Sequence, residues 1–132
     1  MNEVTAIHHV SLTVTDLDRS VAWYSELFGL ARVMDEQHDN GHAVVLVQPH
    51  TNVFIGLHAH TGTGPGRFAE TTVGLDHVAL TVGDRSVLET WGRRLDQHRV
   101  EHSEIKDRPY GSILTLRDPD NIQLELYAPP PA

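Results

Sequence analysis

Two stretches of the chain are nearly the same and decide the fold. Residues 7–16 read IHHVSLTVTD and residues 75–84 read LDHVALTVGD, with identical residues at six of the ten positions and a spacing of 68. In both stretches valine and leucine alternate with other residues, which is the period-two pattern of a strand with one buried face. A repeat at a fixed spacing predicts a fold built from two similar modules.

Each copy of this strand is followed by a polar breaker and a helix-like segment. Residues 16–28 and 85–98 both place apolar side chains three or four positions apart, which is the spacing of one helix face. Either Asp16 or Asp18 can cap the first helix and Asp84 can cap the second, because a carboxylate accepts hydrogen bonds from the free N–H groups there. We therefore predict two helices, one after each repeated strand.

Three further strand-like runs separated by turn residues follow each helix. The predicted strands are residues 31–35, 42–48 and 52–58 in the first half, and residues 100–105, 112–117 and 122–127 in the second half. Each half is thus a βαβββ module, and the fold class is α+β. We expect modules at about residues 5–60 and 73–128, joined by a linker at 61–72. Neither module is large enough to close a core comfortably, so residues 1–132 should form a single domain.

The composition excludes several classes of function. With no cysteine among its 132 residues, the chain has no disulfide, no catalytic thiolate and no cysteine-based zinc site. Ten Lys and Arg residues against 18 Asp and Glu give a formal charge of -8, which argues against a nucleic-acid partner. No apolar run approaches the roughly 18 residues of a membrane span, and residues 1–7 contain no secretory apolar region. We expect a soluble, cytoplasmic protein that does not bind a membrane.

Histidine is the one enriched residue type, with ten in the chain. Strand alternation predicts the direction in which two of these side chains point. If Val10 and Leu12 face the first helix, His9 faces the opposite side of the sheet. The same count puts His77 on that side in the second half. In the last predicted strand, the leucines on either side of Glu125 face the helix, so Glu125 also points away from it.

Two imidazoles and one carboxylate are a donor set that suits Fe, Mn, Co, Ni or Zn, and three protein ligands leave coordination positions for water or substrate. A lone histidine on a strand face is more often a solvated or packed residue than a ligand. Two histidines at equivalent positions of a repeat, with a glutamate of matching parity, strengthen the metal interpretation. The pattern alone favours neither interpretation over the other.

Several motifs resemble the vicinal oxygen chelate superfamily, which includes glyoxalases, bleomycin-resistance proteins and extradiol dioxygenases. The matching segments are residues 7–14, 75–82 and 117–126, together with Trp23-Tyr24 and residues 27–30. The resemblance extends from Ile7 to Ala128. It implies two βαβββ modules whose mixed sheets form a cupped surface around one divalent metal ion, with the helices on the outer face. It also implies a homodimer.

The resemblance implies His9, His77 and Glu125 as the metal ligands. His9 is preferred to His8, because strand alternation should turn His8 to the opposite face. Matching residues 52–58 to residues 121–127 puts Gly56 where relatives with four protein ligands carry Glu, Gln or His. This departure argues against strict glyoxalase I-like or methylmalonyl-CoA epimerase-like chemistry. The three-ligand pattern is closer to extradiol dioxygenases and fosfomycin-modifying transferases.

Three further residues are candidates for catalytic roles. His58 has the parity to enter the cup as a ligand or as an acid or base, and the alternative is a packed or solvated side chain. Tyr127 is equivalent to His58 and is either a donor to a substrate oxyanion or part of the cup wall. Tyr110 resembles the mobile Tyr-Gly turn that borders the substrate site in the family, although turn chemistry alone also explains Gly111.

These features predict a metal-dependent enzyme acting on a small oxygen-chelating substrate, through lyase, isomerase or ring-cleaving dioxygenase chemistry. The alternative is a bleomycin-resistance-like protein that sequesters a drug or metabolite in the same cup. Sequestering relatives generally lack the metal triad, so the presence of that triad favours the enzyme. A purely structural module is the third and weakest interpretation.

Overall fold

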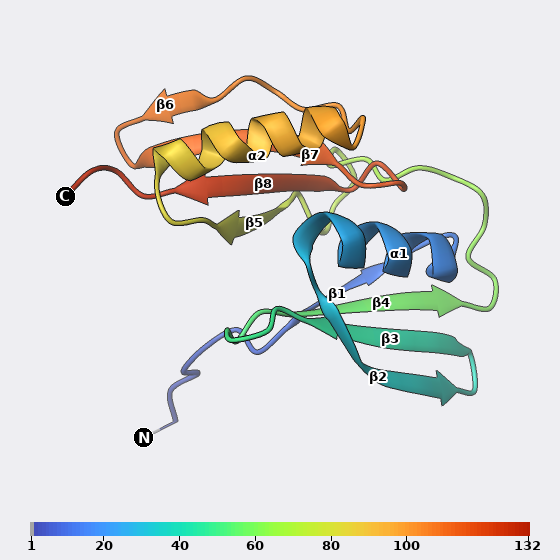
Figure 1. Cartoon of the computed structure of the whole chain (residues 1–132). Helices are drawn as coiled ribbons and strands as arrows, with labels where there is room; N and C mark the ends of the chain where they lie inside the picture. Colours follow the sequence, from blue (N-terminus) through green and yellow to red (C-terminus); the bar gives the residue numbers. More distant parts are fainter. Residues whose placement is uncertain (1) are drawn as a thin grey trace. The chain divides into compact units, whose positions relative to one another are not determined.

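The computed structural model describes residues 2–132 and divides into two compact units on either side of the Gly66–Arg67 bond. Each unit contains one strand, one helix and three more strands (Figure 1). The first unit comprises β1 (Val10–Thr13), α1 (Leu17–Phe28), β2 (Ala31–His38), β3 (Gly41–Val47) and β4 (Phe54–His60). The second comprises β5 (Val78–Thr81), α2 (Arg85–Gln97), β6 (Lys106–Arg108), β7 (Gly111–Arg117) and β8 (Gln123–Ala128). The predicted α+β class and the two βαβββ modules are confirmed.

The two sheets have the same topology. Their strand orders are β1-β4-β3-β2 and β5-β8-β7-β6, and in each the first strand pairs in parallel with the last while the other pairs are antiparallel. Ser11 pairs with Gly56 in the first sheet, and Ala79 pairs with Glu125 in the second. Gly56 and Glu125 are therefore equivalent positions, as the sequence alignment of the halves predicts.

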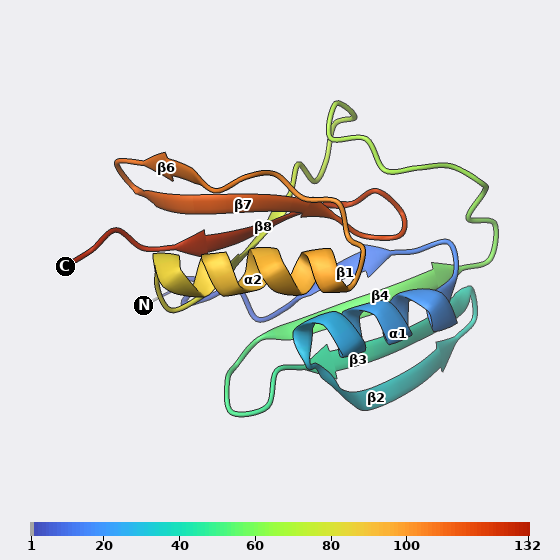
Figure 2. The same cartoon turned by 45° about the horizontal axis from the view of Figure 1, so that its top comes forward.

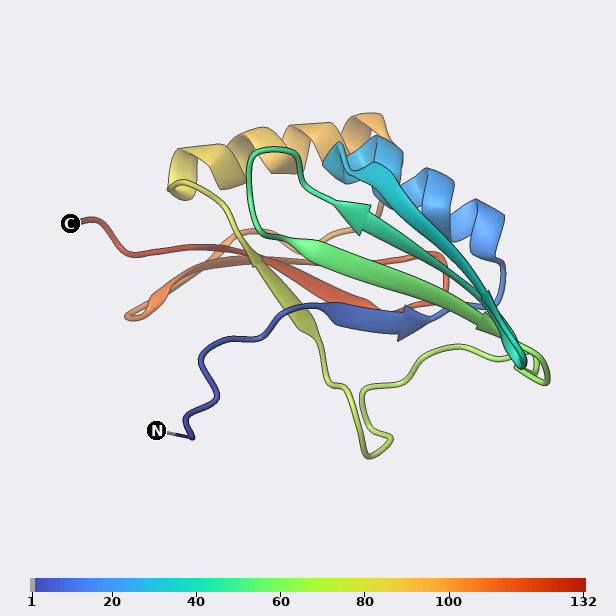
Figure 3. The same ribbon diagram turned by 90° about the horizontal axis from the view of Figure 1, so that it is seen from below.

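In each unit the core lies between the helix and one face of the sheet (Figure 2). Its buried side chains include Leu12, Tyr24, Leu27, Val44, Leu46 and Leu57 in the first unit, and Leu88, Leu95, Leu114, Leu116, Leu124 and Leu126 in the second. The opposite face of the β1–β4 sheet carries no helix of its own unit (Figure 3). The strand parity expected from the sequence is confirmed on β1 and β8, where buried leucines alternate with more exposed residues.

The helix ends follow the predicted capping chemistry. The Asp16 carboxylate accepts a hydrogen bond of 3.0 Å from the backbone N–H of Arg19, and Asp84 accepts one of 3.2 Å from Val87. Asp16, rather than Asp18, is therefore the cap of α1. No helix among residues 2–132 is long and apolar enough to cross a membrane.

The strand predicted at residues 100–105 is wrong. The structure has β6 at Lys106–Arg108 instead, and the predicted segment meets β7 only through an isolated bridge between His102 and Leu116. The reason is side-chain competition for the ladder hydrogen bonds, because the Ser103 hydroxyl accepts from the backbone N–H of Thr115 at 2.9 Å. The remaining strands differ from the prediction only at their ends.

Part of the predicted linker is attached to the second unit. The backbone N–H of Phe68 donates to the carbonyl of Asp120 at 2.9 Å, and the side-chain amide of Asn121 donates to the carbonyl of Phe68 at 2.9 Å. Glu70 forms two hydrogen bonds with the guanidinium of Arg117. The segment just after Gly66 therefore lies against the turn between β7 and β8.

Candidate metal centre

The second unit brings two of the predicted ligands together. Glu125 lies in the middle of β8, and His77 directly precedes β5, which pairs with β8. The distance between Nε2 of His77 and Oε2 of Glu125 is 3.4 Å, which is longer than an ordinary hydrogen bond. Two donor atoms that each lie about 2.1 Å from one ion at a tetrahedral angle are about 3.4 Å apart. The pair is therefore spaced as two ligands of one ion would be.

Asp76 contacts the other ring nitrogen of His77. Its carboxylate oxygen lies 2.7 Å from Nδ1. A carboxylate only accepts hydrogen bonds, so Nδ1 carries a proton, and the atom of His77 that faces Glu125 and could bind a metal is Nε2. Sequence reasoning left open that Asp76 is merely solvated. Its position immediately before the candidate ligand was the one signal for this contact.

His9 belongs to the first unit, and the residue that contacts its ring is a histidine rather than a carboxylate. Its Nδ1 lies 2.8 Å from Nδ1 of His8, and the His8 ring stacks on Phe54 with centroids 5.5 Å apart. Strand alternation predicts that His8 turns away from the cup, and the contact between the two rings does not test that prediction. Both residues precede β1, which begins at Val10, so the alternation of a strand does not govern them.

At Gly56 two neighbouring side chains lie close to the position that a side chain would take. A Cβ built on Gly56 would lie 2.5 Å from Oγ of Ser11 and 3.5 Å from Nε2 of His58. Gly56, Ser11 and His58 therefore share the face of the sheet that carries no helix. The first unit thus has a glycine with the Ser11 hydroxyl and the His58 imidazole beside it, where the second unit has the carboxylate of Glu125.

His58 belongs to a group of three histidines at one end of the first sheet. Its ring centroid lies 5.7 Å from that of His60 and 6.2 Å from that of His38, and those two are 5.8 Å apart. Burial, followed by the neighbouring imidazoles of His60 and His38, lowers the pKa of His58 below its usual value. His58 is therefore neutral at physiological pH and available to accept a proton. The alternation of His58 and His60 on one strand was a signal for this group that sequence reasoning did not use.

The two candidate tyrosines are in contact in the second unit, Tyr110 in the turn before β7 and Tyr127 on β8. The hydroxyl of Tyr127 donates a 2.6 Å hydrogen bond to the backbone carbonyl of Tyr110. A Cβ on Gly111, whose φ is 139°, would come within 2.5 Å of the Tyr127 ring. Gly111 therefore permits the close approach of Tyr127, while the Tyr110 side chain is exposed. The Tyr127 hydroxyl is engaged with the backbone, as expected for a wall residue.

The structure thus groups the candidate residues by unit. His77 and Glu125 lie together, Tyr110 and Tyr127 lie together, and His58 lies among the histidines of the first sheet. Within residues 2–132, no three histidine or carboxylate side chains are gathered as a ready-made metal centre. The convergence of His9 with His77 and Glu125 is part of the proposal below.

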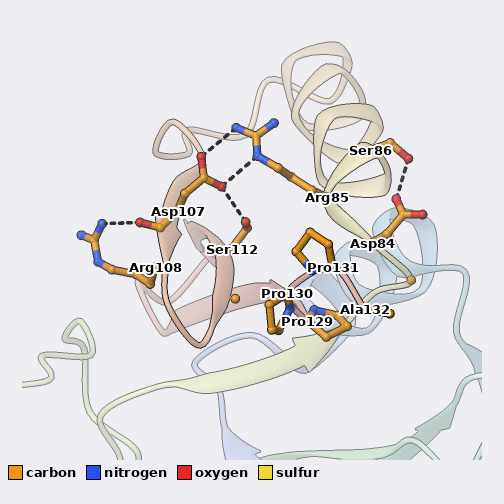
Figure 4. Close-up of a pocket in the computed structure, with 12 residues that line it drawn as sticks. Asp84, Arg85, Ser86, Asp107, Arg108, Ser112, Pro129, Pro130, Pro131 and Ala132 are labelled. Atoms are coloured by element: carbon orange, nitrogen blue, oxygen red, sulfur yellow. Dashed lines mark hydrogen bonds and ion pairs between the residues drawn. The ribbon is translucent and has the colours of Figure 1, made fainter.

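A separate hollow of about 700 Å³ lies in the second unit, between the start of α2, the β6–β7 turn and the C-terminal prolines (Figure 4). Two charged residues of this hollow, Arg85 and Asp107, form an ion pair. Arg85 donates to both oxygens of Asp107, at 2.8 and 3.1 Å, and Ser112 donates to the same carboxylate at 2.6 Å. These contacts lower the pKa of Asp107 to about 2. None of the predicted catalytic or metal-binding residues lines this hollow.

The comparisons with known proteins agree with the fold. The sequence model of the Glyoxalase/Bleomycin resistance protein/Dioxygenase superfamily matches residues 6–126. The chain belongs to this superfamily. A search of curated proteins finds no significant match.

Solved structures of the superfamily's fold cover almost the whole chain. A glyoxylase/bleomycin resistance protein/dioxygenase domain from Frankia sp. EAN1pec is 34% identical, with a TM-score of 0.90, and the match covers 97% of this chain and 100% of that one. TnmS3, an antibiotic binding protein from Streptomyces sp. CB03234, is 19% identical with a TM-score of 0.76, covering 96% and 98%. A variant of the fosfomycin resistance protein FosX from Listeria monocytogenes, complexed with Mn(II) and 1S,2S-dihydroxypropylphosphonic acid, is 18% identical with a TM-score of 0.73, covering 97% and 93%. The last two likenesses concern the fold alone.

Proposed function

We propose that this superfamily member is a metal-dependent enzyme that binds a small substrate through two neighbouring oxygen atoms. The metal is one divalent ion of Fe, Mn, Co, Ni or Zn, held by His9, His77 and Glu125. The observation that carries the proposal is the 3.4 Å separation of His77 Nε2 and Glu125 Oε2, with Asp76 holding the other nitrogen of His77. Neutral imidazole with carboxylate is the donor set that such ions prefer.

When bound, the metal supplies a Lewis acid that polarises the substrate oxygens. The chain's own residues supply the remaining functions. His58 is neutral because of its burial and its histidine neighbours, so it can take a proton from the substrate. Gly56 supplies no side chain that could act as a fourth ligand, and the Ser11 hydroxyl lies beside it. Tyr127, anchored to the carbonyl of Tyr110, forms a wall that orients the substrate.

The absence of a side chain at Gly56 also bears on the class of reaction. With three protein ligands, a bound ion would keep coordination positions for both substrate oxygens. We therefore propose a lyase or dioxygenase in preference to an isomerase that depends on a fourth protein ligand. The FosX complex with Mn(II) and a dihydroxypropylphosphonic acid supports metal use and an oxygen-rich ligand in this fold.

A sequestering protein is the second candidate function. It is favoured by the likeness to TnmS3, which is an antibiotic binding protein, and by the engaged hydroxyl of Tyr127. Such a protein would bind its ligand without metal and would not turn it over. The His77–Glu125 spacing favours the enzyme over this alternative.

The test is metal analysis of protein purified without added metal, followed by a substrate screen with the ion that is found. We expect close to one divalent ion per chain. Chelator-treated protein should keep its circular dichroism spectrum and lose turnover. Tight ligand binding by metal-free protein, with no turnover under any of the five metals, would establish the sequestering function instead. Sedimentation of the same preparation tests the homodimer that we also propose.

A further inference from the structure

We propose that Asp76 and Gln123 are positioning residues for His77, and that the Arg117–Glu70 ion pair anchors them. This inference rests on the proposed metal site and extends it to four residues that do not touch the metal. All of them lie in the second unit, and a continuous series of hydrogen bonds connects them from Glu70 to His77.

The first hydrogen bond of this series is made by His77. Asp76 accepts from Nδ1–H at 2.7 Å, which fixes the tautomer that leaves the Nε2 lone pair for a metal. The side chain of Asp76 is 66% exposed, so burial alone does not hold it in place. Gln123 does, because its amide donates to Oδ1 of Asp76 at 3.2 Å and to the Asp76 carbonyl at 3.3 Å.

Arg117 determines which way the Gln123 amide points. Its Nη2 donates to the side-chain carbonyl oxygen of Gln123 at 3.2 Å, so the amide nitrogen is directed to Asp76. An amide in the reverse orientation would place two oxygens together at Asp76 and two donors together at Arg117. The arginine thus acts on His77 through two intervening side chains.

Glu70 in turn fixes Arg117. Its two carboxylate oxygens accept from Nη1 at 2.8 Å and Nη2 at 3.0 Å, a bidentate arrangement that restricts the guanidinium to one orientation. The hydrogen bond from Arg117 lowers the pKa of Glu70 to about 2. The carboxylate of Glu70 is therefore charged at neutral pH and remains paired with Arg117. Glu70 lies in the segment that follows the boundary between the units.

Strand β8 explains why this arrangement acts on the metal site. Gln123 and Glu125 are two residues apart on β8, so their side chains share one face. The same strand therefore presents a metal ligand and the tether for the partner of the other ligand. In the first unit the residue equivalent to Asp76 is His8, which has no fixed hydrogen-bonding role because either imidazole can donate.

The experiment is a titration of the metal-free full chain with Co(II), followed by visible absorption. Asp76→Ala should weaken Co(II) binding by about 10- to 100-fold, the usual effect of removing such a partner. Asp76→Asn keeps an acceptor oxygen and should lose less. Gln123→Leu should lose less than Asp76→Ala, and Glu70→Gln least of all. Asp96→Ala is the matched control, because Asp96 pairs with His102 at 2.7 Å outside this network.

A second readout separates positioning from a merely structural role. The melting temperature of the metal-free Asp76→Ala protein should equal that of wild type. A lowered melting temperature with unchanged Co(II) affinity would overturn the positioning role. His77→Ala shows whether the site itself exists: if it binds Co(II) as wild type does, the proposed function fails. If His77→Ala abolishes binding while Asp76→Ala and Asp76→Asn leave it unchanged, only the positioning inference fails.

Discussion

The two modules share a backbone plan and differ on the face of the sheet opposite the helix. Both have an aspartate-capped helix, a parallel first and last strand, and the same register across that pair. At the equivalent positions on the open face, the first module has Gly56 and His58, and the second has Glu125 and Tyr127. The features that the two copies share maintain the fold, while the proposed chemistry rests on the residues by which the copies differ.

The residue that contacts each candidate histidine also differs between the two modules. Asp76 gives His77 a carboxylate that fixes its tautomer, whereas His8 gives His9 a second imidazole. In the proposed centre, the second module contributes a carboxylate ligand and a supported histidine, and the first contributes one histidine and no ligand at position 56. We infer that metal affinity arises mainly in the second module, because the first module contributes fewer ligands.

Removing a ligand of the second module should have the largest effect. His77→Ala and Glu125→Ala should each abolish most of the bound metal, because two donors remain from a set of three. Mass spectrometry of purified protein measures the occupancy. Glu101→Ala, an exposed glutamate of the same unit, is the control and should keep its metal. Unchanged occupancy in both ligand variants would contradict the assignment.

The backbone features common to both modules should give large and similar losses of stability. Gly41 and Gly111 begin β3 and β7 with φ of 157° and 139°, and a Cβ there would lie 2.0 and 2.5 Å from a backbone carbonyl oxygen. Gly41→Ala and Gly111→Ala should each lower the free energy of unfolding by at least about 1–3 kcal/mol.

Urea denaturation measures this loss. Gly83→Ala is the control, because its Cβ would make only an ordinary 3.6 Å contact with Val87. A loss in one glycine variant without the other would show that the two turns are not equivalent.

Giving the first module the carboxylate of the second should make the two more alike. Gly56→Glu should tighten metal binding, roughly tenfold if the added bond contributes about 1.4 kcal/mol, and suppress turnover by occupying a substrate position. A Cβ at position 56 would approach Oγ of Ser11 to 2.5 Å, so the serine must rotate. Gly56→Ala carries the same steric change without a ligand and is the control. Metal affinity and activity that both match wild type would show that position 56 does not face the metal.

The smallest effect concerns the anchor at Glu70. The hydrogen bond from Arg117 lowers the pKa of Glu70 from 4.5 to about 2, so the folded state favours the charged carboxylate. Its stabilising contribution is complete above pH 4.5 and is lost as the pH falls towards 2. The stability difference between wild type and Glu70→Gln should therefore narrow below pH 4.5. Urea denaturation at a series of pH values measures it, and a difference that does not change with pH would contradict the ion pair.

Much of the fold follows from one repeated pattern in the sequence. Burial on one face forces valine and leucine to alternate at residues 10–14 and 78–82, and this parity also predicts which residues share the opposite face. The equivalence of Gly56 with Glu125 follows from aligning the halves, and the observed register confirms it. The helix caps Asp16 and Asp84 are local features that a short stretch of sequence is sufficient to predict.

The parts that were not predictable depend on side-chain contacts outside regular strands. His8 meets His9 because both precede β1, where alternation does not apply. Residues 100–105 have a strand-like composition, yet Ser103 uses its hydroxyl to replace a ladder hydrogen bond. Gln123 reaches Asp76 across 47 positions of sequence, and no periodicity within either segment indicates that contact.

The most direct measurement is a crystal structure of the metal-loaded protein with anomalous scattering recorded at the absorption edge of the bound metal. We predict one principal peak per chain, at about 2.0–2.2 Å from an imidazole nitrogen of His9, from Nε2 of His77 and from a carboxylate oxygen of Glu125. A principal peak bonded instead to His38, His58 and His60, or one bonded to His77 and Glu125 without His9, would contradict the proposed centre.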